Sequence, residues 1–199
     1  MAAHEDGKAD YSAEVATLAS AGGDAVAVIG YLDQGGKGII QGSLDSGAFD
    51  TFILSDGMIG DSLIDAFGND LNKSFGSLPG STGKGATVFA DVAKAAGIDS
   101  SGPYTGESYD AAALIVLAMQ AGGKADRATV QQNVMSVANA PGTKIYPGEL
   151  KKALDLLASG KAVDYEGATG VAFTEVGEAE GSFLEKEIKG GKFSTKQQR

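Results

Sequence analysis

The sequence predicts an α/β protein that begins on a parallel sheet and continues into a mostly helical region. Two short apolar runs, 24–31 and 50–55, are rich in β-branched and aromatic residues. Such runs are typical of strands that are buried on both faces. Helical patterns over 11–21 and 34–46 alternate with them through short loops. This order predicts parallel strands joined by right-handed crossovers.

The remaining elements follow in order along the chain. A short helix over 61–67 leads to a weak strand over 75–78, and the glycine- and proline-containing stretch 79–83 is a candidate crossing between domains. Three to four helices are predicted next, over about 84–96, 104–121, 127–137 and 148–158. Strand patterns return at 168–173 and 182–188, followed by a turn at Gly190-Gly191. We expect the polar tail, 194–199, to be frayed.

Two segments of this second region carry their own expectations. The helix over 104–121 is apolar without interruption from Ala111 to Met119. A helix that is apolar on all sides is expected to be buried. The charged stretch 178–189 is expected to form a solvated sheet edge.

The composition excludes several classes of function. The chain has no cysteine, which removes disulfides, thiol nucleophiles and cysteine zinc sites. Its net charge of -10 disfavours binding to nucleic acid. The single histidine, His4, lies in a polar N-terminal stretch without the apolar core of a signal peptide, and no apolar run is long enough to span a bilayer. We therefore expect no metal, no cofactor and no nucleic-acid partner.

Patterns typical of enzymes also fail. The stretch 80–85 resembles a phosphate loop, but the first glycine is missing and no Ser or Thr follows Lys84. No dinucleotide fingerprint lies between a strand and a helix, and no nucleophile–base pair is visible. A phospho-acceptor domain built on Asp56 would need an acidic pair after an earlier strand, and the sequence has none there. We expect a binding protein without a chemical step.

Candidate binding residues follow two neighbouring strands. Tyr31 ends the first predicted strand, and Asp56-Gly57 follows the second, so all three open onto the edge of the sheet where ligands gather. An acid and an aromatic ring there could hold an ammonium group. Tyr104 follows a Gly-Pro pair at the start of the apolar helix. The alternatives are a capping aspartate, a rim tyrosine and a packed tyrosine.

Several of these residues also form an ordered set of motifs. They are Asp10-Tyr11-Ser12, Val28-Ile29-Gly30-Tyr31, Ser55-Asp56-Gly57, Ser101-Gly102-Pro103-Tyr104 and Tyr109-Asp110-Ala111-Ala112. The set resembles the Leu/Ile/Val-binding type I periplasmic binding proteins, which serve as substrate-binding components of branched-chain amino acid ABC transporters. The resemblance covers about 10–193.

The resemblance implies two Rossmann-like α/β lobes with the ligand between them. Residues 1–79 and 180–193 would belong to the second, C-terminal lobe, and 84–175 would be the mostly helical C-terminal portion of the first. The chain would then be the C-terminal part of a longer protein. We expect such a part to self-associate as a dimer and to bind free amino acids weakly.

The resemblance also implies a periplasmic protein that delivers a branched-chain or other small amino acid to a membrane permease. By position, Asp56 matches the acid that pairs with the ligand's ammonium group, next to Gly57. Tyr31 and Tyr104 match aromatic residues of the cleft. The family's acid is a glutamate, so the aspartate here leaves the identity of the solute open. The alternative is a binder or sensor of a short amide or urea-type solute.

Overall fold

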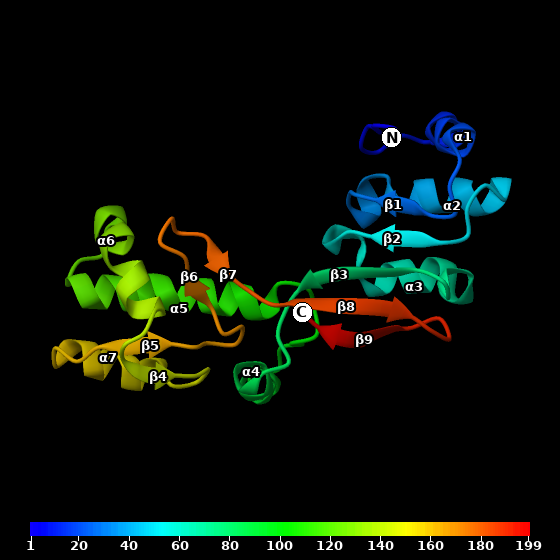
Figure 1. Cartoon of the computed structure of the whole chain (residues 1–199). Helices are drawn as coiled ribbons and strands as arrows, with labels where there is room; N and C mark the ends of the chain where they lie inside the picture. Colours follow the sequence, from blue (N-terminus) through cyan, green and yellow to red (C-terminus); the bar gives the residue numbers. More distant parts are fainter. The chain divides into compact units, whose positions relative to one another are not determined.

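The computed structural model describes all 199 residues, which form two compact units (Figure 1). Unit 1 consists of Met1–Leu78 and Leu184–Arg199, and unit 2 consists of Pro79–Phe183. The chain therefore leaves unit 1 once and returns to it once. No helix of the structure combines the length and the apolar character needed to cross a membrane.

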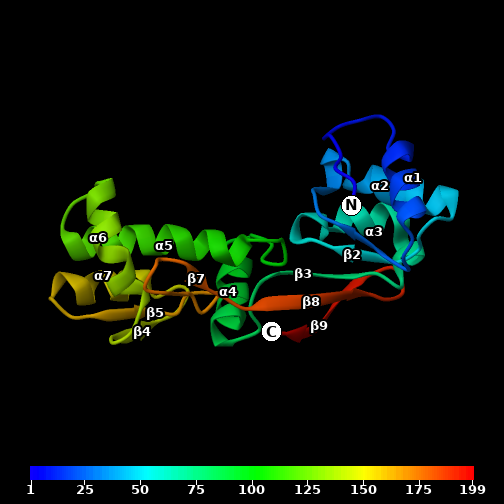
Figure 2. The same cartoon turned by 45° about the horizontal axis from the view of Figure 1, so that its top comes forward.

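Unit 1 is a five-stranded sheet with helices packed on it. Its strands are hydrogen-bonded in the order β1 (Val26–Val28), β2 (Phe52–Leu54), β3 (Phe75–Pro79), β8 (Phe183–Ile188) and β9 (Phe193–Gln198). Its helices are α1 (Ser12–Ala21), α2 (Gly36–Ser46) and α3 (Asp61–Phe67), with the short 3-10 helices η1 (Leu32–Gln34), η2 (Asp56–Met58) and η3 (Gly68–Leu71). Both views show α2 and α3 on the same face of the sheet (Figure 1 and Figure 2).

The sheet is mixed. β1, β2 and β3 are parallel, as the sequence predicts, and β8 and β9 are antiparallel to each other. The amide of Ile188 donates to the carbonyl of Ser74 (3.1 Å), and that of Gly80 donates to the carbonyl of Ser182 (3.0 Å). Residue numbers thus run in opposite directions along β3 and β8, so this pair is antiparallel. The α/β class is confirmed, but the sheet is not parallel throughout, because β8 returns from unit 2 against β3.

The two faces of this sheet differ in cover. Alternate residues of β1–β3 are buried in one apolar core with residues of α2 and α3. On the opposite face Ala27, Ile53 and Phe75 are exposed, and Ile53 is in register with both of the others. A row of apolar side chains therefore crosses that face.

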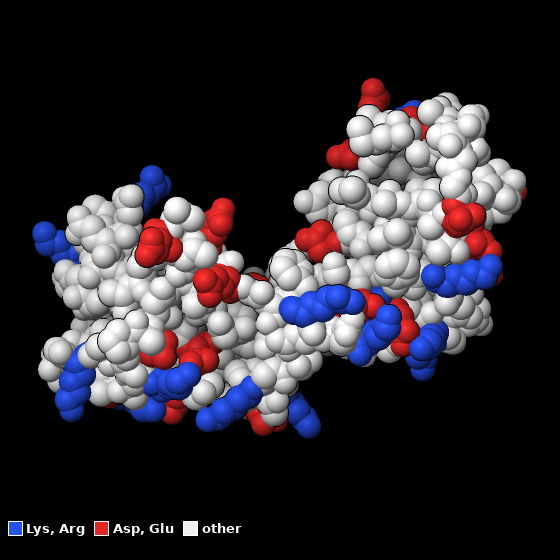
Figure 3. Space-filling view, viewed as in Figure 1, with Lys and Arg blue, Asp and Glu red and all other residues white.

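The two edges of the sheet also differ, in the polarity of their strands. β1, at one edge, contains no charged residue, whereas β9, at the other, is polar. The Glu185 carboxylate on β8 accepts hydrogen bonds from Lys196, Gln197 and Arg199, which hold the pKa of this carboxyl at about 2. Basic and acidic side chains lie interleaved around this hairpin (Figure 3).

Two expectations about this region are wrong. Residues 194–199 are not frayed, because the turn at Gly190-Gly191 returns the chain along β8 and pairs it there. The charged stretch 178–189 does not form the edge, because β8 lies between β3 and β9.

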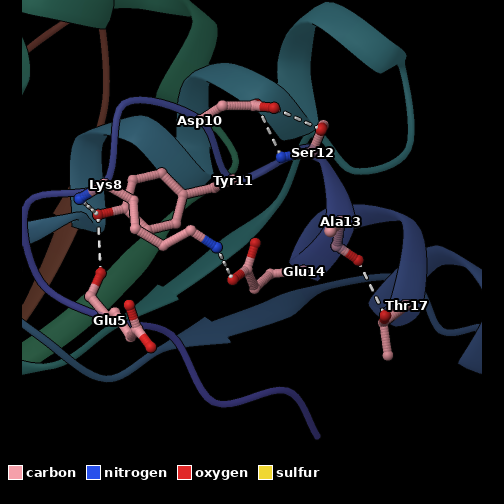
Figure 4. A network of polar contacts seen from close by, with 8 residues as sticks. All are labelled: Glu5, Lys8, Asp10, Tyr11, Ser12, Ala13, Glu14 and Thr17. Carbon is pink, nitrogen blue, oxygen red and sulfur yellow. Dashed lines mark hydrogen bonds and ion pairs between the residues drawn. The ribbon is translucent and has the colours of Figure 1, made fainter.

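Tyr11 anchors the N-terminal segment to unit 1 (Figure 4). Its hydroxyl donates to the carbonyl of Glu5 (3.0 Å) and accepts from the amide of Lys8 (3.0 Å). Its ring is buried with residues of α1 and α2. Lys8 forms an ion pair with Glu14 (2.5 Å). The Asp10 carboxylate accepts a hydrogen bond from the amide of Ser12 (2.9 Å), the first residue of α1. The segment is thereby folded back onto α1.

Unit 2 is mostly helical. Its helices are α4 (Lys84–Ala95), α5 (Thr105–Gly122), α6 (Arg127–Ala138) and α7 (Leu150–Ala158). Its strands are the parallel pair β4 (Thr143–Ile145) and β5 (Val163–Tyr165), and the antiparallel pair β6 (Ala172–Phe173) and β7 (Ala179–Glu180). The four predicted helices are present. β4, β5 and β7 were not predicted, and the strand predicted over 168–173 is restricted to β6.

Within this chain, α5 is buried on one side only. One side of α5 packs against α6, α7 and the β4–β5 pair and buries Ala113, Leu114, Leu117 and Ala118. The other side leaves Ile115 and Val116 45% and 41% exposed. Within unit 2, the apolar run of α5 therefore has one covered face and one bare face.

Candidate functional site

Three of the four predicted binding residues lie in two loops at the carboxyl ends of β1 and β2. Ser55 ties these loops together. Its amide donates to the carbonyl of Val28 (3.1 Å), and its hydroxyl lies 3.3 Å from both the amide nitrogen and the carbonyl oxygen of Gly30. The parallel register of β1 and β2 thus continues into the loops that carry Tyr31 and Asp56.

Gly57 and Tyr31 are in close contact. A β carbon on Gly57 would lie 2.5 Å from the carbonyl oxygen of Gly30 and 2.8 Å from Cδ1 of Tyr31. Only glycine fits there without movement of its neighbours. The Tyr31 ring therefore lies directly beside the Gly57 backbone, and 64% of the residue remains exposed. The structure brings these two predicted residues together.

An open groove of about 530 Å³ adjoins this contact. It is lined by Tyr31, Leu32, Asp33, Gln34 and Gly57. Asp33 forms an ion pair with Lys37 (2.5 Å), one turn along the chain. The groove thus offers one aromatic ring and one paired carboxylate.

Asp56 lies beside this groove rather than in its wall. It is exposed, and it opens η2. Its carboxylate accepts a hydrogen bond from the amide of Gly57 (2.8 Å). That bond orients the carboxylate on the loop that also carries the Gly57–Tyr31 contact.

His4, for which we expected no role, lies against the loop that follows β1. Its ring atoms are 3.3 Å from a β carbon built on Gly30 and 3.1 Å from one built on Gly35. The ring also meets Tyr11 edge-on, with centroids 6.0 Å apart. The sequence gives no signal for this contact, because it depends on the folding of the N-terminal segment over unit 1.

Tyr104, the fourth predicted residue, belongs to unit 2. It precedes α5, and its carbonyl accepts the amide of Ser108 in the first turn (2.9 Å). Its φ of 61° makes it the one non-glycine residue with a positive φ. A bulky residue in this region is strained, and such strain tends to occur at functional positions. The side chain is partly exposed, at 40% for the residue.

Sequence reasoning gave no role to Asp110, which organises unit 2. Asp110 lies on α5 and is 2% exposed, and each of its carboxylate oxygens accepts two hydrogen bonds. Oδ1 accepts from the Tyr165 hydroxyl (2.9 Å) and the Ala168 amide (2.8 Å). Oδ2 accepts from the amide (2.8 Å) and the hydroxyl (2.7 Å) of Thr169. One carboxylate thus fixes the whole loop after β5. An acid directly before the apolar run of this helix was the available signal.

Burial of the Tyr165 hydroxyl, beside the Asp110 carboxylate, raises the pKa of this tyrosine. Two glycines allow the loop to fit around the carboxylate. A β carbon on Gly167 would lie 2.3 Å from Asp110 Oδ1, and one on Gly85 would lie 2.1 Å from the Gly167 carbonyl. The loop is therefore held between α4 and α5. Asp110 and Glu107 also border a largely apolar cavity of about 360 Å³ in unit 2.

Comparison with known sequences gives one partial match. No protein-family model matches the chain. A stretch of 68 residues is 40% identical to the substrate-binding protein BasB of a chemotactic signal transduction system in Halobacterium salinarum. This stretch covers 34% of the chain and 16% of that protein.

Solved structures match nearly the whole chain. A leucine-binding protein from Thermotoga maritima gives a TM-score of 0.67 at 19% identity, covering 96% of this chain and 49% of that one. A type 1 periplasmic binding protein from Bordetella pertussis gives 0.67 at 20%, covering 96% and 50%. A branched-chain amino acid ABC transporter protein from Thermus thermophilus with bound valine gives 0.60 at 16%, again covering 96% and 50%. The chain spans about half the length of the solved structures it matches.

These matches define the class of the fold. The chain has the α/β fold of about half of a bilobal type I periplasmic binding protein. Within that class, two of the matched structures are described as a leucine-binding protein and a branched-chain amino acid transporter protein.

Proposed function

We propose that this chain is part of the substrate-binding component of an ABC importer and that the protein binds a branched-chain or other small amino acid. The observation that carries the proposal is the exposed Tyr31 ring held against Gly57, at the carboxyl ends of two parallel strands. Ligands of open α/β sheets bind at this edge. The shared fold with leucine- and valine-associated proteins supports the choice of solute.

Each candidate residue has a distinct role in this proposal. The Asp56 carboxylate pairs with the ligand's ammonium group, since charge-assisted hydrogen bonds are the stronger kind. The Tyr31 ring covers the ligand's apolar part next to Gly57. Tyr104, whose backbone is strained, supplies a second aromatic wall. In the whole protein the solute would be enclosed by two lobes and delivered to a permease on the periplasmic side of the membrane.

The alternative is a binder or sensor of a short amide or urea-type solute. One observation favours a role in sensing, because the sequence relative BasB is described as part of a chemotactic signal transduction system. The aspartate at position 56 favours a ligand that differs from those of binders with a glutamate, since its side chain is one methylene shorter. An amide would accept and donate hydrogen bonds at this rim without needing the negative charge.

Titration of the ¹⁵N-labelled chain tests these assignments by NMR. Valine, leucine and acetamide are added in turn up to about 50 mM, because half of a binding site is expected to bind in the millimolar range. We expect valine to shift the amide signals of Tyr31, Asp56 and Gly57, and acetamide to leave them in place. No shift with valine would contradict the assignment of this rim as the site.

Two matched variants test the role of the acid. Asp56→Asn should abolish the shifts caused by valine, because it removes the charge that pairs with the ammonium group. Asp33→Asn removes the same charge from the wall of the groove, where the carboxylate is already paired with Lys37. We expect Asp33→Asn to retain the shifts. If the two variants behave in the opposite way, Asp33 is the recognition group instead of Asp56.

A further inference from the structure

One short loop supplies most of the groove in unit 1. This loop, residues 30–35, begins at Gly30 and ends at Gly35, and we call it the groove loop. All four residues between the two glycines line the groove. Within the loop, the carbonyl of Tyr31 accepts the amides of Gln34 (3.3 Å) and Gly36 (3.1 Å). The backbone therefore turns back on itself, and the placement of Tyr31 depends on how the two ends of the loop are held.

One side chain from outside the groove loop packs against both of its ends. The Cε1 and Nε2 atoms of His4 lie 3.3 and 3.4 Å from a β carbon built on Gly30. Its Cδ2 atom lies 3.1 Å from a β carbon built on Gly35, whose φ of 123° also favours glycine. A side chain at either glycine would push the ring away. The two glycines thus let a single imidazole ring fit closely behind the loop.

Tyr11 holds His4 in this place. Its ring meets the His4 ring edge-on, and its hydroxyl donates to the carbonyl of Glu5, the residue directly after His4 (3.0 Å). The same hydroxyl lies 2.5 Å from a β carbon built on Gly35. Because Tyr11 is 4% exposed, its position is fixed by the core of unit 1. One buried tyrosine therefore fixes both the backbone beside His4 and the far end of the groove loop.

We propose that His4 is a positioning residue for ligand binding, whose ring holds the groove loop in the shape that presents Tyr31 to the groove. The inference rests on the proposed function, since it gives His4 a task in binding. His4 does not line the groove, so it acts through the loop rather than on the ligand. A loop that is ordered before the ligand arrives costs less entropy on binding. Loss of the ring should therefore loosen the loop and weaken binding.

NMR relaxation of the ligand-free, ¹⁵N-labelled chain tests the positioning first. His4→Ala removes the ring, and His4→Phe keeps a flat ring at the same place. The amide order parameters of residues 31–35 should fall from about 0.85, typical of rigid backbone, to below about 0.6 in His4→Ala. They should stay high in His4→Phe.

Lys8→Ala is the matched control. It removes the ion pair with Glu14 from the same N-terminal segment and leaves His4 and Tyr11 in place. We expect it to leave the order parameters of the groove loop unchanged. Far-UV circular dichroism verifies that all three variants keep the fold.

Titration with valine then tests the consequence for binding. The concentration of valine at which the shift of the Gly57 amide is half complete should rise about threefold to tenfold in His4→Ala, because the loop must be ordered on binding. In His4→Phe and Lys8→Ala it should stay near the value of the natural chain. If the natural chain itself does not respond to valine, the proposed function fails, whereas the ligand-free comparison still decides whether His4 holds the loop.

Four results would overturn the proposal. The first is a groove loop that is as ordered in His4→Ala as in the natural chain. The second is a loop that is as mobile in His4→Phe as in His4→Ala, since a ring at position 4 would then not be what holds it. The third is a loop that Lys8→Ala loosens equally, because the effect would then belong to the whole N-terminal segment. The fourth is a loosened loop in His4→Ala with an unchanged response to valine.

Discussion

Replacement of Asp110 by alanine should strongly destabilise unit 2. The carboxylate accepts four hydrogen bonds, of which those from the Tyr165 hydroxyl and the Ala168 amide are fully buried. A hydrogen bond to a charged group contributes about 1.5–3 kcal/mol, but bonds to one carboxylate are not additive. Removing the carboxylate leaves the two fully buried donors without a partner, and each unsatisfied buried group costs about 1–3 kcal/mol. We expect a loss of about 4 kcal/mol in the free energy of unfolding of unit 2.

Urea denaturation followed by far-UV circular dichroism measures this loss, with a separate transition fitted for each unit. Asp110→Asn keeps one acceptor oxygen and should cost about half as much, since two of the four donors lose their partner. Tyr165→Phe removes a single donor and should cost about 1–2 kcal/mol. An Asp110→Ala variant within about 0.5 kcal/mol of the natural chain would refute the idea that this carboxylate holds the loop.

Other parts of unit 1 give three further predictions. Hydrogen bonds from Lys196 and its neighbours lower the folded-state pKa of Glu185 from 4.5 to about 2. These bonds therefore stabilise the fold fully above about pH 4.5, and their effect is lost as the pH falls through about 2. Amide chemical shifts of β9 that titrate near pH 4.5 would contradict this prediction. Gly57→Ala should displace the adjacent loop and cost about 1–3 kcal/mol in thermal unfolding, whereas Gly181→Ala, with open space around it, should cost far less. Tyr11→Phe removes two hydrogen bonds and should speed proteolysis of the N-terminal segment without unfolding the sheet.

The elements that sequence reasoning predicted well are those with clear local signals. α3 occupies the predicted range, 61–67, because glycines flank it on both sides. β1 and β2 were identified from continuous apolar runs. The direction of β8 could not be predicted, because it depends on where the chain returns after unit 2. β4 and β5 were missed because neither is a continuous apolar run, since Lys144 lies in the middle of β4 and Asp164 in the middle of β5.

The candidate site was predictable only in part. The sequence pattern located the edge of the sheet at which the site lies, because Tyr31 and Asp56 follow two apolar runs. It could not show that Gly57 must be glycine, because the reason is the approach of Gly30, more than twenty residues earlier. The bare face of α5 was also hidden, because an apolar sequence does not tell which side has a neighbour. Asp110 was visible as an acid in an apolar helix, but the three residues that donate its four hydrogen bonds lie beyond position 164.

The position of unit 2 within the chain has a consequence for folding. Unit 2 is an insertion between β3 and β8, which are neighbouring strands of one sheet. A ribosome that has released only residues 1–183 has made β1, β2 and β3 but not the strand that completes their sheet. Closing a long disordered loop costs entropy that grows with its length. When unit 2 folds first, its two ends come together, because the amide of Gly80 donates a hydrogen bond to the carbonyl of Ser182 (3.0 Å). Folding of the insertion thus removes most of the loop-closure cost for the pairing of β3 with β8, and couples the order of synthesis to the order of assembly.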